Sequence, residues 1–484
     1  MIRSHPSPIL FGAALLIAAG ASPHIHAAAI SAGITGIAPR HVVRHRAPEA
    51  PADKIWLYQL ALPFQVSATK AGVFVNVREG LAQGVDFEAG NDILIFGSLD
   101  EIPTAKPIVT SRNEILPNPN TVPPGKPSTM VKFPVRGGFV PHGAKRADGT
   151  PHPHAGTGFG FSIMQAWQTI VPGPPPYRQL SYQGAESYLV WDLQQYSYDG
   201  QTFRVKSEHI PIGDILPGWS IPNGGVTNAI PDGDDMLIAM LGKEIVKPGG
   251  DPNSRRIGAG VMRMRRDAGK WRAVSIDIVP GTQYLSEPSV IRDIDGRLLF
   301  SGRGGRTDQR TNDVQVWRSD KNDRNWEKII DVKDIIVTPV SLNQAADGTP
   351  YLAAGLNNIT PGPNDPLTIA AKKAGTPVAV GKGSRSTLCI WPLNADRNGL
   401  EKPIVVKDCR AEFGPPPGNS NWTWRADHPS GMALRLADGK WHTLLGVRVQ
   451  DYREIKEAMP PTPQTGMYVH EILTRGQPRP VWKF

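Results

Sequence analysis

The feature that most constrains the fold of this chain is an Asp-Gly dipeptide that recurs between two apolar runs. One copy spans residues 339–355, with apolar residues on both sides of the dipeptide. Asp-Gly between strand-like runs predicts a β-hairpin, because the tight turn of a hairpin favours residues that accept positive φ. We expect both the Asp and the Gly to adopt positive φ. The five dipeptides are Asp148-Gly149, Asp232-Gly233, Asp295-Gly296, Asp347-Gly348 and Asp438-Gly439. Their recurrence predicts a fold built from one repeated unit.

A second hairpin follows each of these five inner hairpins. The outer hairpins are expected at residues 187–205, 260–274, 314–330, 387–406 and 466–484. Two hairpins give four antiparallel strands, which make one blade of a β-propeller. We therefore predict an all-β chain that forms a six-bladed β-propeller of four-stranded antiparallel blades, with seven blades as the alternative. An irregular β-sandwich would not explain why inner and outer hairpins alternate in a constant order.

The N-terminal third is divided differently. Residues 1–29 resemble a secretory signal, with Arg3 before an apolar run at 9–21 and small residues at 27–29. The apolar run is too short to span a bilayer, and no later stretch is long enough, so we expect an exported protein without a membrane span. Residues 30–132 are expected to add strands for one or two blades, or a strand that closes the ring. Residues 133–484 are expected to hold the five clear blades.

Charge and cysteine content narrow the partners and the compartment. The formal net charge of +9 favours an acidic partner, but Lys and Arg are scattered, which argues against nucleic acid. We expect an acidic partner other than nucleic acid, a monomeric protein, and no cofactor. In an oxidising compartment the two cysteines, Cys389 and Cys409, are predicted to form a disulfide across an outer hairpin, with two buried thiols as the alternative. The absence of CxxC spacing argues against a metal or a nucleophilic thiol.

Two segments resemble the sialidase-like propellers. Ser319 to Trp326 is similar to their Asp-box turn, with serine and tryptophan retained and Lys321 and Asp323 in place of the usual Asp and Gly. Residues 139–150 resemble the opening blade of the family, although Phe139 stands where sialidases carry an arginine that binds the substrate carboxylate. The resemblance implies a propeller with carbohydrate chemistry. It assigns the Asp-box a structural role as a stabilised turn.

A geometric argument places the candidate site at one mouth of the ring. Residue-proline pairs at Val140, Glu287, Thr338 and His428 are predicted to start inner strands, where the missing N–H of proline costs little. Residues at and before these starts should ring the mouth, and the second inner strand should return to it. The predicted mouth residues are Tyr284, Glu287, Arg425, Asp427, His428, His154, Arg303, Arg306, Arg448, Asp451 and Tyr452.

These residues suggest roles in proton transfer and anion binding. Glu287 and Asp427 are candidates for acid and base, while Arg303, Arg306, Arg425 and Arg448 are candidates for binding a carboxylate or sulfate. The alternative is that the carboxylates pair with these arginines and hold blades together. His428 directly follows Asp427, so regular strand alternation places the two side chains on opposite faces and predicts no contact between them.

The histidines near the first Asp-Gly turn leave three interpretations open. His152 and His154 are two residues apart, and His142 lies nearby in the sequence. This spacing suits a metal site with a third ligand, a histidine that contacts sugar, or a structural turn. We predict a site without a metal, with His154 as a catalytic candidate.

Two classes of function follow from this mouth. The first is an exported enzyme that cleaves an anionic, uronate- or sialate-containing glycan. As a glycosidase it would use Glu287 and Asp427; as a lyase it would use Tyr284, Tyr452 or His154 to move a proton. The second class is a non-catalytic propeller that binds glycan or protein. Carboxylates saturated by arginines would favour binding, whereas a free carboxylate or tyrosine in a basic pocket would favour the enzyme.

Overall fold

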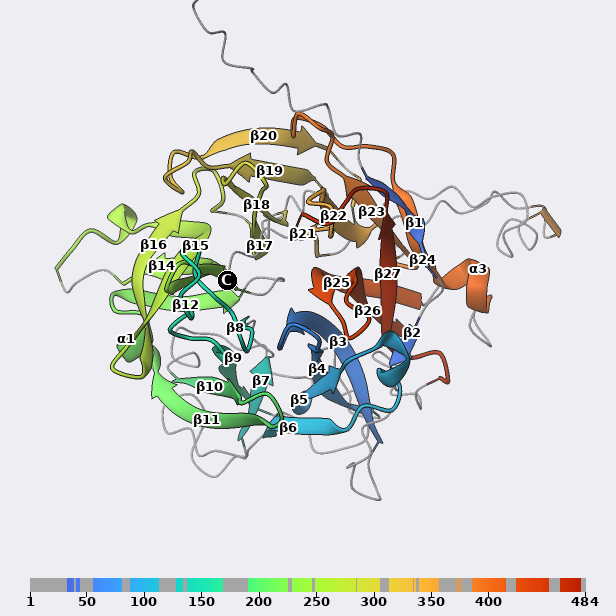
Figure 1. The fold of residues 1–484 in the computed structure, drawn as a ribbon. Helices are drawn as coiled ribbons and strands as arrows, with labels where there is room; N and C mark the ends of the chain where they lie inside the picture. The colour runs from blue at the N-terminus through green and yellow to red at the C-terminus, as the bar shows by residue number, and fades with distance from the viewer. Residues whose placement is uncertain are drawn as a thin grey trace, which may run out of the picture.

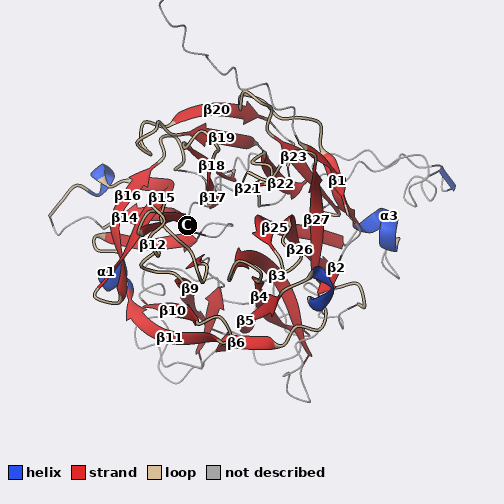
Figure 2. Cartoon of the chain, viewed as in Figure 1, coloured by secondary structure: helices blue, strands red, loops and turns tan. Residues whose placement is uncertain are grey.

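The chain forms a ring of six antiparallel sheets, seen down its axis in Figure 1. The strands dominate and helix is confined to single turns such as α1 (Ile212–Ile215) and α3 (Cys409–Phe413) in the described part of the chain (Figure 2). This computed structural model describes residues 33–38, 41–43, 55–80, 88–112, 128–133, 137–168, 190–224, 229–245, 249–283, 285–304, 313–333, 335–336, 339–356, 372–373, 375, 385–414, 424–451 and 462–479. The predicted six-bladed β-propeller is confirmed.

Each blade is one sheet, numbered here in chain order. Blade 1 contains β3 (Ile55–Gln65), β4 (Ala71–Gly80), β5 (Glu88–Phe96) and β6 (Pro107–Arg112). Blade 2 contains β7 (Ser128–Phe133), β8 (Gly138–Val140), β9 (Thr157–Gln168), β10 (Val190–Tyr198) and β11 (Phe203–Pro211). Blade 3 contains β12 (Trp219–Gly224), β13 (Ile230–Asp232), β14 (Asp235–Glu244), β15 (Ile257–Asp267) and β16 (Lys270–Ile278).

The second half of the ring is more regular. Blade 4 contains β17 (Ser286–Arg292), β18 (Leu298–Arg303), β19 (Val314–Arg318) and β20 (Glu327–Val332). Blade 5 contains β21 (Ser341–Gln344), β22 (Pro350–Gly355), β23 (Thr387–Pro392) and β24 (Ile404–Asp408). Blade 6 contains β25 (Trp424–Arg435), β26 (Trp441–Asp451) and β27 (Gly466–Thr474). Figure 1 shows β17, β21, β25 and β3 near the centre and β20, β11 and β6 at the rim.

The two ends of the described chain meet in blade 6. Strands β1 (Ile34–Ile37) and β2 (His41–Val43) both pair with β27, whose other edge pairs with β26. Residues 480–484, expected as the hairpin partner of this strand, lie outside the described residues, and β1 and β2 pair with its second edge. The start of the described chain therefore fixes the last blade into the ring.

Apolar side chains fill the spaces between neighbouring blades. One buried cluster joins blades 4 and 5 and includes Leu299, Leu342 and Trp391. A second joins blades 5 and 6 and includes Tyr351 and Val447. Because every described inner strand is covered by neighbours on both sides, its residues are buried on both faces rather than alternating with solvent.

The Asp-Gly turns close the inner hairpins by a different turn from the one predicted. Only the glycine of each dipeptide has positive φ, for example +86° at Gly296. In the hairpin of blade 4, Asp293 N–H donates to Arg297 O and Gly296 N–H donates to Asp293 O, which is a three-residue loop with its glycine in the left-handed region. The carboxylate of Asp295 accepts a 2.9 Å hydrogen bond from Arg297 N–H. The carboxylates of Asp148, Asp347 and Asp438 accept the equivalent bond.

The Asp-box-like segment lies between β19 and β20, where the resemblance predicted it. Asp320, one residue earlier than the family's aspartate, accepts hydrogen bonds from the N–H groups of Asn322 and Arg324. Asp323 takes a φ of +63° where the family uses glycine. Trp326 Nε1 donates to Asp277 of blade 3 at 2.7 Å. The turn is thus retained with substituted residues, and its tryptophan links two blades.

The predicted disulfide between Cys389 and Cys409 is wrong, because both cysteines are free and buried. Cys389 pairs in register with Val405, not with Cys409, which begins α3 beyond the end of β24. The two thiols also face different interfaces. Cys389 packs with the cluster between blades 4 and 5, and Cys409 with the cluster between blades 5 and 6. The sheet of blade 5 therefore separates them.

Candidate functional site

Two β-bulges at equivalent places in blades 4 and 6 build the candidate site. The pairing of β17 with β18 shifts between Ser286 and Ser289, and that of β25 with β26 shifts between Asp427 and Ser430. The bulges hold Glu287 and His428, with φ of +48° and +49°. Such values are uncommon for residues other than glycine, and they recur at functional sites. Each of these residues precedes a proline, as the sequence indicated.

The bulge overturns the prediction that Asp427 and His428 point apart. His428 Nδ1 lies 3.0 Å from Asp427 Oδ1, within hydrogen-bonding distance. An extra residue in a strand re-aims the side chains that follow it, so simple alternation does not hold there. On its other side, His428 Nε2 lies 3.6 Å from Glu287 Oε1. The three side chains form a row, Asp427–His428–Glu287, that we call the mouth row.

The mouth row joins two blades that are not neighbours in the ring. Glu287 belongs to blade 4 and His428 to blade 6, and β21 of blade 5 lies between their inner strands. Asp427 is fully buried, whereas the side chains of His428 and Glu287 are 19% and 21% exposed. The imidazole and the glutamate are therefore the members of the row that a ligand could reach.

Three arginines surround the mouth row. Arg448 Nε donates to Asp427 Oδ1 at 2.7 Å, and Arg385 donates to Asp427 Oδ2 at 3.0 Å. Arg303 donates to Glu287 Oε2 at 3.0 Å. Arg303 and Arg385 keep 30% and 20% of their side chains exposed. In this cluster three guanidinium groups face two carboxylates, an excess of one positive charge that favours an anionic ligand.

Arg385 was missed by the sequence interpretation. It lies just before β23, and its carbonyl accepts a hydrogen bond from Ala426 N–H. The mouth residues were predicted from the two inner strands of each blade alone. Since a third strand begins at the same end as the first, the chain entering β23 also belongs to the mouth. The order of the hairpins in the sequence was enough to predict that Arg385 lies at the mouth.

The arginines and the imidazole keep both carboxylates ionised. Burial alone would raise the pKa of Glu287, but the nearby imidazole of His428 and the bound guanidinium of Arg303 outweigh it and lower the pKa to about 2. Burial of Asp427 is likewise outweighed, chiefly by Arg448, His428 and Arg385, which hold its pKa well below the usual range. Glu287 is therefore a proton acceptor at neutral pH rather than a donor.

The remaining predicted residues divide into three groups. Arg425 lies on β25 two positions before Asp427, is half-buried, and pairs in register with Gln450. Asp451 is buried at the end of β26, where its N–H donates to Thr465 Oγ1. Tyr284, Arg306 and Tyr452 lie outside the described residues.

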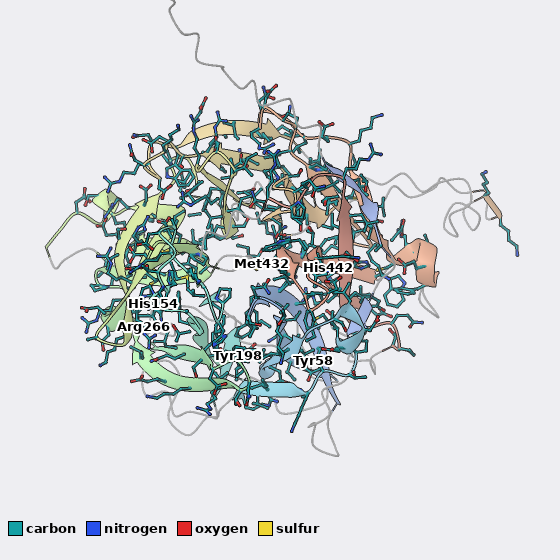
Figure 3. The ribbon with its side chains drawn as sticks, in the orientation of Figure 1. Tyr58, His154, Tyr198, Arg266, Met432 and His442 are labelled. Atoms are coloured by element: carbon teal, nitrogen blue, oxygen red, sulfur yellow. The ribbon has the colours of Figure 1, made fainter. Side chains whose placement is uncertain are left out.

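His154 does not join the mouth row. Residues 141–156 connect the end of β8 to the start of β9. They lie at the end of the ring that carries the Asp-Gly turns, which we call the turn end. Val140-Pro141 therefore closes an inner strand rather than starting one. His152 Nε2 hydrogen-bonds Gly233 O in the Asp-Gly turn of blade 3. The His154 ring lies 5.6 Å from that of Trp271, and Figure 3 shows it near Arg266. The prediction of His154 at the same mouth as Glu287 is wrong.

The surroundings of these histidines favour the structural interpretation. Burial, His152 and Arg266 lower the pKa of His154. His142 packs edge-on against Tyr198, away from the contact between His152 and His154. Among the described residues, no group of three His, Cys, Asp or Glu side chains is arranged to hold a metal ion. Within all the described ranges, no helix is long and apolar enough to cross a membrane.

Comparison with solved structures finds distant similarity to enzymes with sugar substrates. A Trypanosoma rangeli sialidase complex is 11% identical with a TM-score of 0.46, and the match covers 90% of this chain but only 59% of that one. A sialidase from Streptococcus pneumoniae is 10% identical with a TM-score of 0.45, and the match covers 90% of this chain and 71% of that one. An α-L-arabinanase from Penicillium chrysogenum is 10% identical with a TM-score of 0.42, and the match covers 91% of this chain and 99% of that one. No family model and no curated protein matches the chain.

Proposed function

We propose that the mouth row cleaves a glycosidic bond in an anionic, uronate- or sialate-containing glycan. The observation that supports this most is the contact of His428 with carboxylates on both sides, among three arginines. Asp427 is positioned to fix the imidazole through Nδ1, leaving Nε2 toward the accessible side. Arg303 and Arg385 supply charge for a carboxylate or sulfate of the substrate.

The geometry favours β-elimination over hydrolysis by paired carboxylates. Hydrolysis of that kind needs two carboxyl groups that reach the scissile bond. Asp427 is fully buried and bound by two guanidinium groups, so it is not available to substrate. In β-elimination, arginines neutralise the uronate carboxylate and make the adjacent C5 proton more acidic. Nε2 of a neutral His428 accepts that proton, the electron pair forms a C4=C5 double bond as the C4–O bond breaks, and the leaving oxygen takes a proton from solvent.

A second candidate is a propeller that binds an anionic glycan without cleaving it. One observation favours it: both carboxylates of the row are already ion-paired with arginines. Such pairs also serve to hold neighbouring strands and blades together. On this account the accessible arginines bind the glycan, and the row is part of the scaffold.

One experiment separates these candidates. The purified protein is incubated with polyuronates, sialosides and neutral polysaccharides, and both reducing ends and ultraviolet absorbance are measured. New absorbance together with reducing ends identifies an unsaturated uronate and supports β-elimination. Reducing ends alone would replace it with hydrolysis through Glu287. If glycan binds by calorimetry without either signal, the binding candidate holds, and an absence of binding would refute both.

We also propose export, on the basis of the leader predicted at residues 1–29. Expression of the full chain in a bacterial host, followed by N-terminal sequencing of the protein from each fraction, tests this. A product that begins near residue 30 in the exported fraction is expected. A full-length product confined to the cytoplasm would contradict it.

A further inference from the structure

Strand β21 of blade 5 lies between the two strands that carry the bulges. It has extensive contacts with β17 on one side and β25 on the other. Close to the bulges it is hydrogen-bonded to each neighbour, with Leu342 N–H donating to β17 and the side chain of Asn343 accepting from β25. We propose that Asn343 of β21 is a positioning residue that fixes the bulge of His428 and thereby aligns the mouth row.

Asn343 is fully buried, and its carboxamide makes hydrogen bonds through both polar atoms. Its Oδ1 accepts a 2.8 Å hydrogen bond from Gly431 N–H on β25. Its Nδ2 donates to the carbonyl and the hydroxyl of Ser341 at 3.1 and 2.9 Å. These bonds fix the orientation of the amide, so its oxygen faces β25 in a defined place.

The residue that Asn343 holds lies directly beyond the bulge. The register of β25 resumes at Ser430, so Gly431 is the second regular residue after His428 and Pro429. At Gly431 the backbone is packed against blade 5, because a Cβ there would lie 2.1 Å from the Tyr351 hydroxyl. The Asn343 bond therefore fixes the backbone three residues from His428, in a place without room for displacement toward blade 5.

The bulge of Glu287 has a matching connection. Ser289 is the residue at which the register of β17 resumes, and its Oγ accepts a 2.9 Å hydrogen bond from Leu342 N–H. The adjacent residues Leu342 and Asn343 thus connect to both bulges. Glu287 and His428 belong to blades that do not touch side by side in the ring, so a common reference on blade 5 sets the 3.6 Å between them.

The test compares Asn343→Leu with a matched control at the turn end. There, Ala346 N–H of blade 5 donates to Thr443 Oγ1 of blade 6 at 2.8 Å, which is the same kind of buried bond. Thr443→Val removes that bond far from the mouth row. Asn343→Asp keeps an acceptor for Gly431 N–H and serves as the conservative variant.

The first readout is the imidazole signal of His428 in nuclear magnetic resonance spectra, assigned with His428→Gln. This readout does not need a substrate. Asn343→Leu is expected to shift the signal and its titration midpoint, while Thr443→Val leaves both unchanged and Asn343→Asp restores them toward the native values. An unmoved signal in a folded Asn343→Leu protein would overturn the proposal. If that variant does not fold, Ser289→Ala tests the same alignment from blade 4, with the same expected shift.

The second readout is glycan turnover, and this part rests on the proposed function. Asn343→Leu should lower kcat about tenfold more than Thr443→Val with a smaller change in KM, because a misplaced proton acceptor slows the chemical step. Equal losses in the two variants would overturn the positioning role and leave the proposed function intact. A shifted His428 signal in a protein that cleaves no glycan would refute the proposed function and leave the positioning role intact.

Discussion

The two ends of the ring both hold networks of arginine and aspartate, yet they are built differently. At the turn end, Arg292 of blade 4 bonds Asp232 of blade 3 and Asp323 at 2.8 and 2.9 Å. Arg263 also bonds Asp232, at 2.6 Å. At the mouth, the carboxylate of Asp427 is fully buried and the row contains a histidine held on a bulge. The turn end is a set of ion pairs between blades, whereas the mouth adds a group that can transfer protons.

The two ends also differ in the backbone conformation of the strand residues that carry their charged side chains. The turn-end carboxylate of Asp232 lies on a regular strand end and is partly exposed, as expected for a pair whose role is to connect blades. Glu287 and His428 occupy unfavourable backbone regions that regular strands would avoid. At the turn end, Arg292 and Asp232 connect blades 4 and 3 from ordinary strand positions. Asp323 of the same network also has a positive φ, of +63°, but it lies in a turn, whereas Glu287 and His428 lie within strands.

The largest expected effect comes from removing the buried carboxylate. Asp427→Ala removes a fully buried carboxylate that Arg448 and Arg385 share, which should destabilise the protein by about 3–5 kcal/mol and abolish turnover. The partly exposed Asp232→Ala at the turn end should cost about 1 kcal/mol and leave turnover unchanged. Urea unfolding and glycan assays on both variants measure this. Equal losses of stability would remove the distinction between the two ends.

The accessible members of the row should affect activity far more than stability. His428→Ala and Glu287→Ala are each expected to abolish detectable turnover while the midpoint of thermal unfolding moves by less than about 3 °C, because both side chains are partly exposed. Scanning calorimetry and the glycan assay test this together. A drop in the midpoint as large as that of Asp427→Ala would mean that these residues hold blades together instead.

Acid should lower the stability of the native protein more than that of a variant whose residue 287 carries no charge. The pKa of Glu287 is lowered from 4.5 to about 2, so its contribution to stability is complete above its ordinary pKa and is lost as the pH falls toward about 2. The stability of the native protein should therefore fall more steeply between pH 4.5 and about 2 than that of Glu287→Gln. Urea midpoints at successive pH values measure the two slopes. Parallel slopes would contradict the ion pairing of Glu287.

The smallest expected effect has the opposite sign and lies away from the mouth. The hydrogen bond that His442 Nδ1 donates to Glu471 Oε1 is the chief cause of the raised pKa of His442, with Asp438 adding to it. A raised pKa stabilises the folded state below the unfolded pKa, and this contribution disappears as the pH rises through the folded value. Glu471→Gln should thus lose more stability in mildly acidic than in alkaline buffer. The same loss in both buffers would argue against the pair.

The sequence was sufficient for the architecture, and of the six side chains that meet at the mouth row it missed only Arg385. Hairpin periodicity predicted the propeller, and the position just before a proline indicated Glu287 and His428. The bulges themselves were not visible, because an extra residue in one strand depends on the pairing with its neighbour. That omission caused the wrong prediction for Asp427 and His428, and treating every Asp-Gly hairpin alike placed His154 at the wrong end.

The failed disulfide has a related physical cause. The two cysteines flank one hairpin in the sequence, but facing across a hairpin requires the same register and the same face of the sheet. Cys409 lies past the end of the strand, and apolar packing draws the two thiols to opposite sides of blade 5. Such pairing depends on tertiary contacts that sequence spacing does not contain.

The most direct test of the central claim compares one histidine from each end of the ring. Glycan turnover is measured side by side in the native protein, His428→Ala and His154→Ala, after each variant is shown to be folded. The account predicts that turnover disappears in His428→Ala and persists in His154→Ala. Turnover that persists in His428→Ala and disappears in His154→Ala would contradict it and move the working site to the turn end.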